Sequence, residues 1–359
     1  MNSTGPPVKG RGAQSNRSGR FEALSREAFD DGWELSEDEP ARRPLATTVS
    51  LDHTRSILTR NDSPDIPFDQ SLNPYRGCEH GCAYCFARPT HAYLGLSPGL
   101  DFETKLLAKP RAAELLRHEL AKPSYVCRPI AMGTNTDPYQ PIEREHRITR
   151  AILEVCLETE HPVSIVTKSA NILRDLDLLT ELARRGLALV FLSVTTLDRG
   201  LAGALEPRAS RPQRRLDALS ALSAAGVPVG VLSSPMIPGL NDHELEEILA
   251  AAQRHGARQA GYVLLRLPLE IKELFAEWLE QHAPDRAARV LALVRQTYDG
   301  KLYDARFGVR GKGSGPYAAL IARRFEVACQ RLGLARERIE LDTTRFRRPS
   351  APRAQLALF

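Results

Sequence analysis

The stretch Cys78-Glu-His-Gly-Cys-Ala-Tyr-Cys85 places three cysteines within eight residues, at the spacing C-x3-C-x2-C. Iron–sulfur clusters normally take four cysteine thiolates. Three thiolates this close together can bind three irons of a cubane cluster and leave the fourth iron without a protein ligand. Because an open iron can bind a small molecule, the triplet predicts a cluster that takes part in chemistry, with Cys78, Cys82 and Cys85 as its ligands.

The residues around the triplet predict repeated βα units. Apolar or β-branched segments predict six strands, at Leu72–Arg76, Pro129–Met132, Val163–Thr167, Leu187–Val194, Val227–Leu232 and Ala260–Leu265. Helical patterns near 110–121, 142–159, 171–185, 212–225 and 242–255 separate them. Such alternation is typical of a parallel sheet, so we expect an α/β fold, a partial (β/α)6 TIM-type barrel. Reactive groups of such barrels follow the strands, and the triplet directly follows the first predicted strand.

The rest of the chain divides into two parts around this core, which we place at residues 46–268. Residues 1–45 are first basic and then acidic without helical or strand periodicity, which predicts a disordered polyampholytic arm. Residues 269–359 predict a C-terminal helical extension, with helices at 270–281, 285–298 and 316–332. Asn241, with Glu244 three residues later, predicts a capped helix start at 242.

The composition indicates a protein of the cytoplasm. No apolar run among the 359 residues approaches the roughly eighteen residues of a membrane span, and the N-terminus lacks the apolar centre of a secretion signal. Six cysteines are too few for a disulfide scaffold, and three of them are crowded into one loop. The net charge of +5 is compatible with a nucleic-acid partner but does not require one.

A structural zinc site is the alternative interpretation of the triplet, with His80 or His91 as the fourth ligand. Zinc sites usually show two separated pairs of ligands, and the sequence has no second pair. The spacing therefore favours the open cluster. Cys156 and Cys329 lie on apolar helical faces, where free cysteine behaves as a small hydrophobic residue. Cys127 precedes the second predicted strand and could approach the rim of the barrel.

Several segments resemble the branch of the radical S-adenosylmethionine (SAM) superfamily that is related to spore photoproduct lyase. Besides the triplet, they are Asn73-Pro-Tyr-Arg-Gly-Cys78, Asp137-Pro-Tyr-Gln-Pro-Ile-Glu143, Thr167-Lys-Ser169, Leu205-Glu-Pro-Arg208 and Ile237-Pro-Gly-Leu-Asn-Asp242. Ser63-Pro-Asp-Ile-Pro-Phe68 and Phe86-Ala-Arg-Pro-Thr-His91 are similar to an uncharacterised bacterial subgroup of that branch.

The resemblance implies the cofactors, a [4Fe–4S] cluster and SAM, and a reductive cleavage of SAM to a 5′-deoxyadenosyl radical that takes hydrogen from a substrate. It also implies an electron donor such as flavodoxin or ferredoxin. Residues that match the family's SAM contacts are Tyr84, Gly133, Thr134, Asp137, Lys168, Ser193 and Ile237. Lys168 would pair with the SAM carboxylate, Ser193 with the ribose, and Tyr84 and Ile237 would lie near the adenine. The alternatives are a solvated Lys168, a turn-capping Ser193 and a core Ile237.

Two positions depart from the family pattern. Spore photoproduct lyase has a hydrogen-donating cysteine where this chain has Gly133, and a tyrosine where it has Phe86. Neither residue can donate a hydrogen atom from a thiol or a phenol. These departures argue against the spore thymine lesion as the substrate.

Two basic segments are candidates for contact with an anionic substrate. The first carries Arg208, Arg211, Arg214 and Arg215 after the fourth predicted strand. The second is the glycine-rich stretch 307–317, with Arg310 and Lys312 before a predicted helix. Arginine suits phosphate recognition, although a solvated basic face is the alternative interpretation of both segments.

The sequence thus leaves three functional hypotheses. The leading one is a radical SAM enzyme acting on nucleic acid, as a lesion-repair lyase or a base-modifying enzyme. The second is the same radical chemistry on a protein or a small metabolite. The third is a non-catalytic metal or electron-transfer protein.

Overall fold

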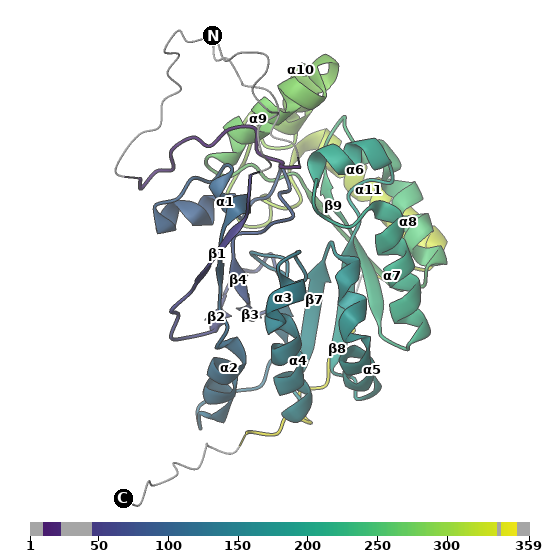
Figure 1. The fold of residues 1–359 in the computed structure, drawn as a ribbon. Coiled ribbons are helices and arrows are strands. Elements are labelled where there is room, and N and C mark those ends of the chain that lie inside the picture. Colours follow the sequence, from purple (N-terminus) through teal and green to yellow (C-terminus); the bar gives the residue numbers. More distant parts are fainter. Residues whose placement is uncertain (1–9, 23–44, 336–338, 350–359) are drawn as a thin grey trace, which may run out of the picture.

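Six parallel strands form the centre of the molecule in the computed structural model, which describes residues 10–22, 45–335 and 339–349 (Figure 1). The strands are β3 (Gln70–Leu72), β6 (Ile130–Met132), β7 (Val163–Thr167), β8 (Ala188–Ser193), β9 (Val229–Met236) and β10 (Gln259–Leu264). They pair in chain order, and the antiparallel β2 (Leu58–Arg60) lies beside β3. Among the described strands, β10 and β2 form the two edges of an open sheet. This arrangement confirms the predicted partial barrel.

Helices connect consecutive strands and cover the sheet (Figure 1). They are α2 (Ala112–Ala121), α3 (Glu143–His146), α4 (Ile148–Glu158), η2 (Ala170–Asp175), α5 (Leu176–Arg184), α6 (Arg199–Leu205), α7 (Pro212–Ala224), η3 (Asp242–Glu244) and α8 (Leu245–Arg254). In α4, one face buries Ile152, Leu153 and Cys156 completely, as helical spacing of apolar residues requires. Cys156 is therefore a core residue, as predicted.

The first predicted strand, Leu72–Arg76, is wrong in its limits. The barrel strand β3 ends at Leu72, and β4 (Tyr75–Arg76) belongs to a second sheet with β5 (Lys105–Ala108) and β1 (Thr48–Leu51). Between β3 and β4 stands Pro74, which has no N–H for the ladder. The cysteine triplet consequently follows β4 rather than a strand of the barrel sheet. Two short helices, η1 (Arg88–Leu94) and α1 (Asp101–Thr104), lie between the triplet and β5 in the chain.

Three longer helices follow the barrel, as the sequence predicts for its C-terminal extension. They are α9 (Ile271–His282), α10 (Pro284–Gln296) and α11 (Gly315–Leu332). The apolar face of α9 buries Phe275 and Trp278 in a cluster that also contains Ile237. Cys329 of α11 is buried in the barrel core, as expected. None of the helices within the described ranges has the length and apolarity of a membrane span.

The helix start at 242 lies where the sequence predicts it, but the predicted capping bond is wrong. The Asn241 side chain makes no cap bond with the helix and donates instead to the carbonyl oxygens of Thr195 (2.7 Å) and Pro235 (3.0 Å). Glu244 accepts from the Thr196 hydroxyl (2.5 Å). Both side chains therefore tie the loop after β8 to the loop after β9.

The N-terminal arm is described only in part. Residues 1–9 and 23–44, which the sequence assigns to a disordered arm, lie outside the described residues. Residues 10–22 differ from that expectation, since Arg11, Gly12 and Ala13 are buried against the body of the protein. They do so through polar contacts rather than through an apolar face, so hydrophobic patterning could not reveal the packing.

Candidate functional site

The cysteine loop, residues 77–87, lies at the carboxyl end of the parallel strands. The Thr136 hydroxyl, which follows β6, donates to the carbonyl of Gly77 (2.7 Å). Ala83 N donates to the carbonyl of Leu205 (2.9 Å), at the end of α6 after β8. These bonds place the loop at the rim, the end at which barrels of this kind carry their reactive groups.

All three cysteines of the loop are free thiols. Cys78 and Cys82 are buried, and Cys85 is partly buried. Tight turns bring them together, with Gly81 N donating to the carbonyl of Cys78 (3.2 Å) and Cys85 N to that of Cys82 (3.2 Å). Burial raises the pKa of each thiol, and the negative charge of Asp137 raises that of Cys78 further. The metal-free loop therefore holds neutral thiols, which lose protons when metal binds.

The loop fits an iron–sulfur cubane better than a zinc ion. Across the part of the chain that the structure describes, no three His, Cys, Asp or Glu side chains converge on one metal-ion position. Three cysteine thiols on one loop suit a cubane, in which each thiolate takes a separate iron. The two histidines proposed as zinc ligands have other contacts, since His80 faces Asp137 and His91 Nε2 contacts the carbonyl of Lys105 (2.9 Å).

Asp137 links the cysteine loop to the end of β7. One carboxylate oxygen accepts from Thr167 Oγ1 (2.7 Å) and Tyr139 N (2.8 Å), and the other from Lys168 N (2.8 Å) with His80 Nδ1 at 3.4 Å. Burial acts to raise the pKa of Asp137, but His80 and these hydrogen bonds outweigh it and lower the pKa to about 2. The carboxylate is ionised and fully engaged by the protein, so it anchors the loops in place.

Lys168, Ser193 and Tyr84 lie together at the ends of β7 and β8. Lys168 Nζ donates to Ser193 Oγ (2.9 Å), and Ser193 Oγ donates to the carbonyl of Ser234 (3.1 Å). The same ammonium stands 5.8 Å from the centre of the Tyr84 ring. Its positive charge opposes the effect of burial, which raises the pKa of Cys82 and Cys85. The structure thus brings these predicted SAM contacts next to the cysteines.

Ile237 lies in the same neighbourhood. It follows β9, is completely buried, and belongs to the apolar cluster that contains Cys82 and Tyr84. The Tyr84 hydroxyl contacts Thr195 Oγ1 (3.1 Å) and donates to the Glu206 carboxylate. The ring of Tyr84 therefore has a fixed position between the cysteine loop and the strand ends.

Gly133 and Thr134 form the turn after β6. Thr134 Oγ1 and the Asn73 side chain exchange hydrogen bonds of 3.0 and 3.2 Å. Gly133 has a φ of +89°, and a Cβ added there would lie 2.0 Å from the carbonyl oxygen of Val166. The close approach of this turn to β7 therefore excludes any side chain at position 133, the position matched to the cysteine of spore photoproduct lyase.

The four rim arginines do not form one free basic surface. Arg215 is buried and paired with the buried Glu206, so the prediction that it meets nucleic acid is wrong. Arg208 is paired with Glu79 (2.8 Å) at the edge of the cysteine loop. Arg211 and Arg214 are exposed and form no ion pair with a described residue. Two of the four guanidinium groups therefore keep an uncompensated charge among the described residues.

Two further expectations need correction. Arg310 of the glycine-rich stretch pairs with Asp65 (2.5 Å), and Gly308 N donates to the same carboxylate (2.6 Å), so that stretch is held by the protein itself. Cys127 precedes β6 and therefore lies at the amino end of the strands, away from the cysteine loop. A role for Cys127 at the rim is excluded by the direction of the strand.

Sequence reasoning missed the buried ionic groups that surround the loop. Arg215 donates to the carbonyl of Ser193 (2.8 Å) as well as to Glu206, and thereby joins β8 to α7. The pKa of Glu206 is about 2, because Arg215 and Lys168 outweigh the effect of burial. Its motif, Leu205-Glu-Pro-Arg208, marked the segment but not the partner, which is contributed by a different turn.

Comparison with known proteins supports a common origin with radical SAM proteins. A profile of the Radical SAM superfamily matches residues 72–252, just over half of the chain. The uncharacterized protein Rv2578c of Mycobacterium tuberculosis is 37% identical over 233 residues, which cover 64% of this chain and 68% of that protein. The uncharacterized protein MJ0683 of Methanocaldococcus jannaschii is 28% identical over 214 residues, covering 60% and 76%.

Solved structures of spore photoproduct lyase show the same fold. A single-site mutant of that lyase superposes with a TM-score of 0.57 at 18% identity, covering 79% of this chain and 78% of that one. The lyase complexed with dinucleoside spore photoproduct gives a TM-score of 0.55 at 17% identity, covering 79% and 77%. The chain belongs to the radical SAM superfamily, and its cofactors are that family's [4Fe–4S] cluster and S-adenosylmethionine.

Proposed function

We propose that Cys78, Cys82 and Cys85 ligate the [4Fe–4S] cluster and that this chain generates the 5′-deoxyadenosyl radical. The observation that carries the proposal is that one loop at the carboxyl end of the sheet bears three free thiols, with the Lys168 ammonium over the ring of Tyr84 in the same loop. When bound, the cluster supplies one electron that splits SAM into methionine and the radical, which takes a hydrogen atom from the substrate. A one-electron donor of the flavodoxin or ferredoxin type supplies that electron.

The residues around the loop bind and orient SAM. Lys168, held by Ser193 beside the Tyr84 ring, is placed to pair with the methionyl carboxylate. Ser193 contacts the ribose, and Ile237 with Tyr84 gives the adenine an apolar surface from which water is excluded. The Gly133–Thr134 turn meets the methionyl end, and Asp137 acts by fixing the backbone of Lys168.

The proposed substrate is nucleic acid. Phe86 directly follows the last cysteine, is 41% exposed, and lies under the guanidinium of Arg266, 4.6 Å from its ring centre. Arg266 follows β10 and makes no ion pair with a described residue, and its Nε is buried without a hydrogen-bond partner. A partly exposed ring stacks on bases, and a guanidinium without an ion pair binds phosphate. Arg211 and Arg214 add charge at the same end of the barrel.

The reaction on that substrate is the repair of a lesion or the modification of a base. A spore photoproduct lyase of the same fold has been solved with dinucleoside spore photoproduct. Because Gly133 and Phe86 cannot donate hydrogen as a thiol or a phenol does, we propose that this chain acts on another lesion or base.

The radical generator is tested by anaerobic reconstitution with iron and sulfide, followed by dithionite and SAM. The expected products are 5′-deoxyadenosine and methionine. Cys85→Ala should abolish their formation, whereas the matched control Cys156→Ala, in the core of α4, should retain it. Product formation by Cys85→Ala would show that the wrong ligands were assigned, and tetrahedral zinc in place of iron and sulfide would leave a structural metal protein.

The substrate class is tested by binding to single-stranded DNA and RNA at increasing salt. Contact with phosphates predicts an affinity that falls steeply with salt concentration. Deuterium transfer from labelled oligonucleotide into 5′-deoxyadenosine would identify the reacting strand. If neither binding nor deuterium transfer is observed, the substrate of the same radical chemistry is a protein or a small metabolite.

A further inference from the structure

A segment near the N-terminus, residues 10–20, lies against the cysteine loop, and we call it the N-terminal strap. The backbone N–H groups of Gly12 and Ala13 donate to the two oxygens of the Glu103 carboxylate, at 3.0 and 2.8 Å. Arg11 donates to the backbone carbonyl of Glu103 (3.0 Å). These contacts join residues about ninety positions apart in the chain and fix the strap at its first half.

The strap touches the cysteine loop backbone to backbone. A Cβ added at Gly12 would lie 1.7 Å from the carbonyl oxygen of Gly81. Gly81 stands between Cys78 and Cys82, and a Cβ there would meet the Glu103 carboxylate at 2.5 Å. Two glycines and one carboxylate therefore form a contact that admits no side chain.

A buried ion pair continues this contact to the cysteines. The Glu103 carboxylate pairs with the guanidinium of Arg88, and both side chains are completely buried. Arg88 Nε donates to the carbonyl of Cys82 (2.9 Å), and Arg88 Nη1 donates to that of Gly99 (2.9 Å). A line of hydrogen bonds thus runs from the amides of the strap through Glu103 and Arg88 to Cys82.

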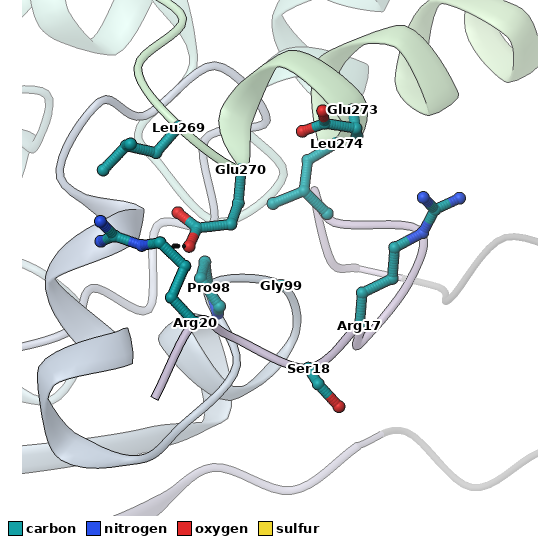
Figure 2. A pocket seen from close by; sticks show the side chains of 9 residues that line it. All are labelled: Arg17, Ser18, Arg20, Pro98, Gly99, Leu269, Glu270, Glu273 and Leu274. Atoms are coloured by element: carbon teal, nitrogen blue, oxygen red, sulfur yellow. Dashed lines mark hydrogen bonds and ion pairs between the residues drawn. The ribbon is translucent and has the colours of Figure 1, made fainter. Parts of the chain in front are cut away.

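The second half of the strap crosses to the C-terminal helices. Asn16 exchanges two hydrogen bonds of 3.0 Å with Asp101, and Arg17 pairs with Glu277 of α9 (2.6 Å). Figure 2 shows Arg20 reaching Glu270, just before α9, where the two side chains form an ion pair (2.7 Å). A pocket of about 380 Å³ lies between the strap and the start of that helix.

We propose that the N-terminal strap is a positioning element for the cluster, with Gly12 and Glu103 as its positioning residues. It fixes the backbone between Cys78 and Cys82 and covers that side of the loop, so that the thiols keep the geometry that holds iron and are shielded from oxygen. This inference rests on the proposed role of the three cysteines. It assigns a role to a segment that lies outside the matched superfamily region of residues 72–252.

The strap is tested first in the iron-free protein, by the rate at which each cysteine reacts with iodoacetamide, followed by mass spectrometry. Gly12→Val should raise the alkylation rates of Cys78 and Cys82 about tenfold or more, because the strap can no longer close on Gly81. The buried Cys156 is the internal control and should react as in the wild type. Arg20→Ala, at the other end of the strap, is the matched variant and should leave all rates unchanged.

A second variant decides the outcome if Gly12→Val unfolds, which faster alkylation of Cys156 would reveal. Arg11→Ala removes hydrogen bonds of the strap without a steric clash. It should also raise the alkylation rates of Cys78 and Cys82, by a smaller factor than Gly12→Val. Wild-type rates at both cysteines in the folded variants would overturn the proposal.

The second readout separates this inference from the proposed function. Reconstituted Gly12→Val or Arg11→Ala should lose the visible absorbance of its cluster in air several times faster than wild type or Arg20→Ala. If wild type itself binds no iron and sulfide, the cluster assignment fails, and the alkylation rates still report on the strap. If wild type holds a cluster and the strap variants bleach at the same rate, the strap inference alone fails.

Discussion

The two ends of the parallel sheet both bury polar side chains, but only the carboxyl end buries complete ion pairs among the described residues. At the carboxyl end, Arg215 with Glu206 and Arg88 with Glu103 are almost fully removed from water. At the amino end, the buried contact is between neutral groups, with the Tyr125 hydroxyl 2.7 Å from His161 Nε2. The Glu160 ion pairs at the amino end have an arginine that keeps contact with water, exposed in Arg345 and partly exposed in Arg185.

This difference follows from what each end must hold in place. Burying two charges costs desolvation free energy, which their attraction regains only in a well-defined geometry. At the carboxyl end, each pair fixes segments outside the strands: Arg88 with Glu103 fixes the cysteine loop, and Arg215 with Glu206 fixes the segments after β8. At the amino end the strands already define the backbone, and Phe346 packs on Tyr125 and His161. Buried ion pairs are therefore concentrated at the end of the sheet where the proposed chemistry requires fixed loops.

The largest effect should come from breaking an ion pair at the carboxyl end. Arg215→Ala leaves the Glu206 carboxylate buried without its cation, and we expect a loss of about 3–5 kcal/mol in the free energy of unfolding. Arg111→Ala, in the exposed pair with Glu114, is the control and should lower the free energy of unfolding far less, because water screens that pair. Urea denaturation measures both. Equal losses would remove the contrast between buried and exposed pairs.

Acid should act on the two ends at different pH values. Burial lowers the pKa of His161 to about 4 from its ordinary 6.5. The unfolded chain therefore binds more protons between these values, and stability should fall as the pH drops from about 6.5 to 4. Asp137, with a pKa of about 2 against an ordinary 3.8, stabilises the fold above about pH 4 and loses this effect only towards pH 2.

His161→Gln separates these two contributions. Its urea midpoint should change less than that of wild type between pH 7 and 4.5. Asp137→Asn should retain the wild-type slope in that range, because Asp137 is ionised in both states there. If the urea midpoint of His161→Gln depends on pH as strongly as that of wild type, a group other than His161 causes the acid sensitivity.

A moderate effect is expected from the ammonium at the carboxyl end. Lys168→Met removes the proposed charge-assisted bond to the SAM carboxylate, which would be worth about 1.5–3 kcal/mol, so SAM should bind about 10- to 150-fold more weakly. Lys122→Met, on the exposed residue after α2, is the matched control. Isothermal titration of reconstituted protein with SAM gives both affinities. If Lys168→Met binds SAM as tightly as wild type does, a residue other than Lys168 binds the SAM carboxylate.

The smallest effect should come from the exposed arginines. Arg211→Ala with Arg214→Ala should weaken nucleic-acid binding and lower the magnitude of the salt-dependence slope by about 2, one for each phosphate contact. The fold should not change, because neither side chain has an ion pair with a described residue. If the double variant shows the same salt-dependence slope as wild type, these two arginines are solvated and do not contact nucleic acid.

The sequence predicts the barrel well because its strands are apolar runs with regular spacing. β7 and α7 lie within a residue of their predicted limits. The first strand is wrong because Pro74 interrupts an apolar run that belongs to two different sheets. The interpretation of Asn241 fails for a similar reason, since its side chain bonds to the neighbouring loops rather than to its own helix.

The candidate site is predictable where single residues carry the signal. The triplet and the strand-end residues Lys168, Ser193 and Ile237 come together in space as the sequence indicates. The ionic partners are not predictable, because nothing in the local pattern around Arg215 identifies Glu206 as its counter-ion. The strap is hidden for the same reason, since its amides bind a carboxylate contributed by a distant helix.

The turn at Gly133 sets a limit for anyone who wishes to re-engineer this protein as a repair catalyst for the spore thymine lesion. A cysteine introduced there would place its Cβ 2.0 Å from the Val166 carbonyl oxygen, so β7 would first have to shift. One codon change cannot install the missing thiol. The divergence between this chain and the repair lyase is therefore built into the spacing of two adjacent strands.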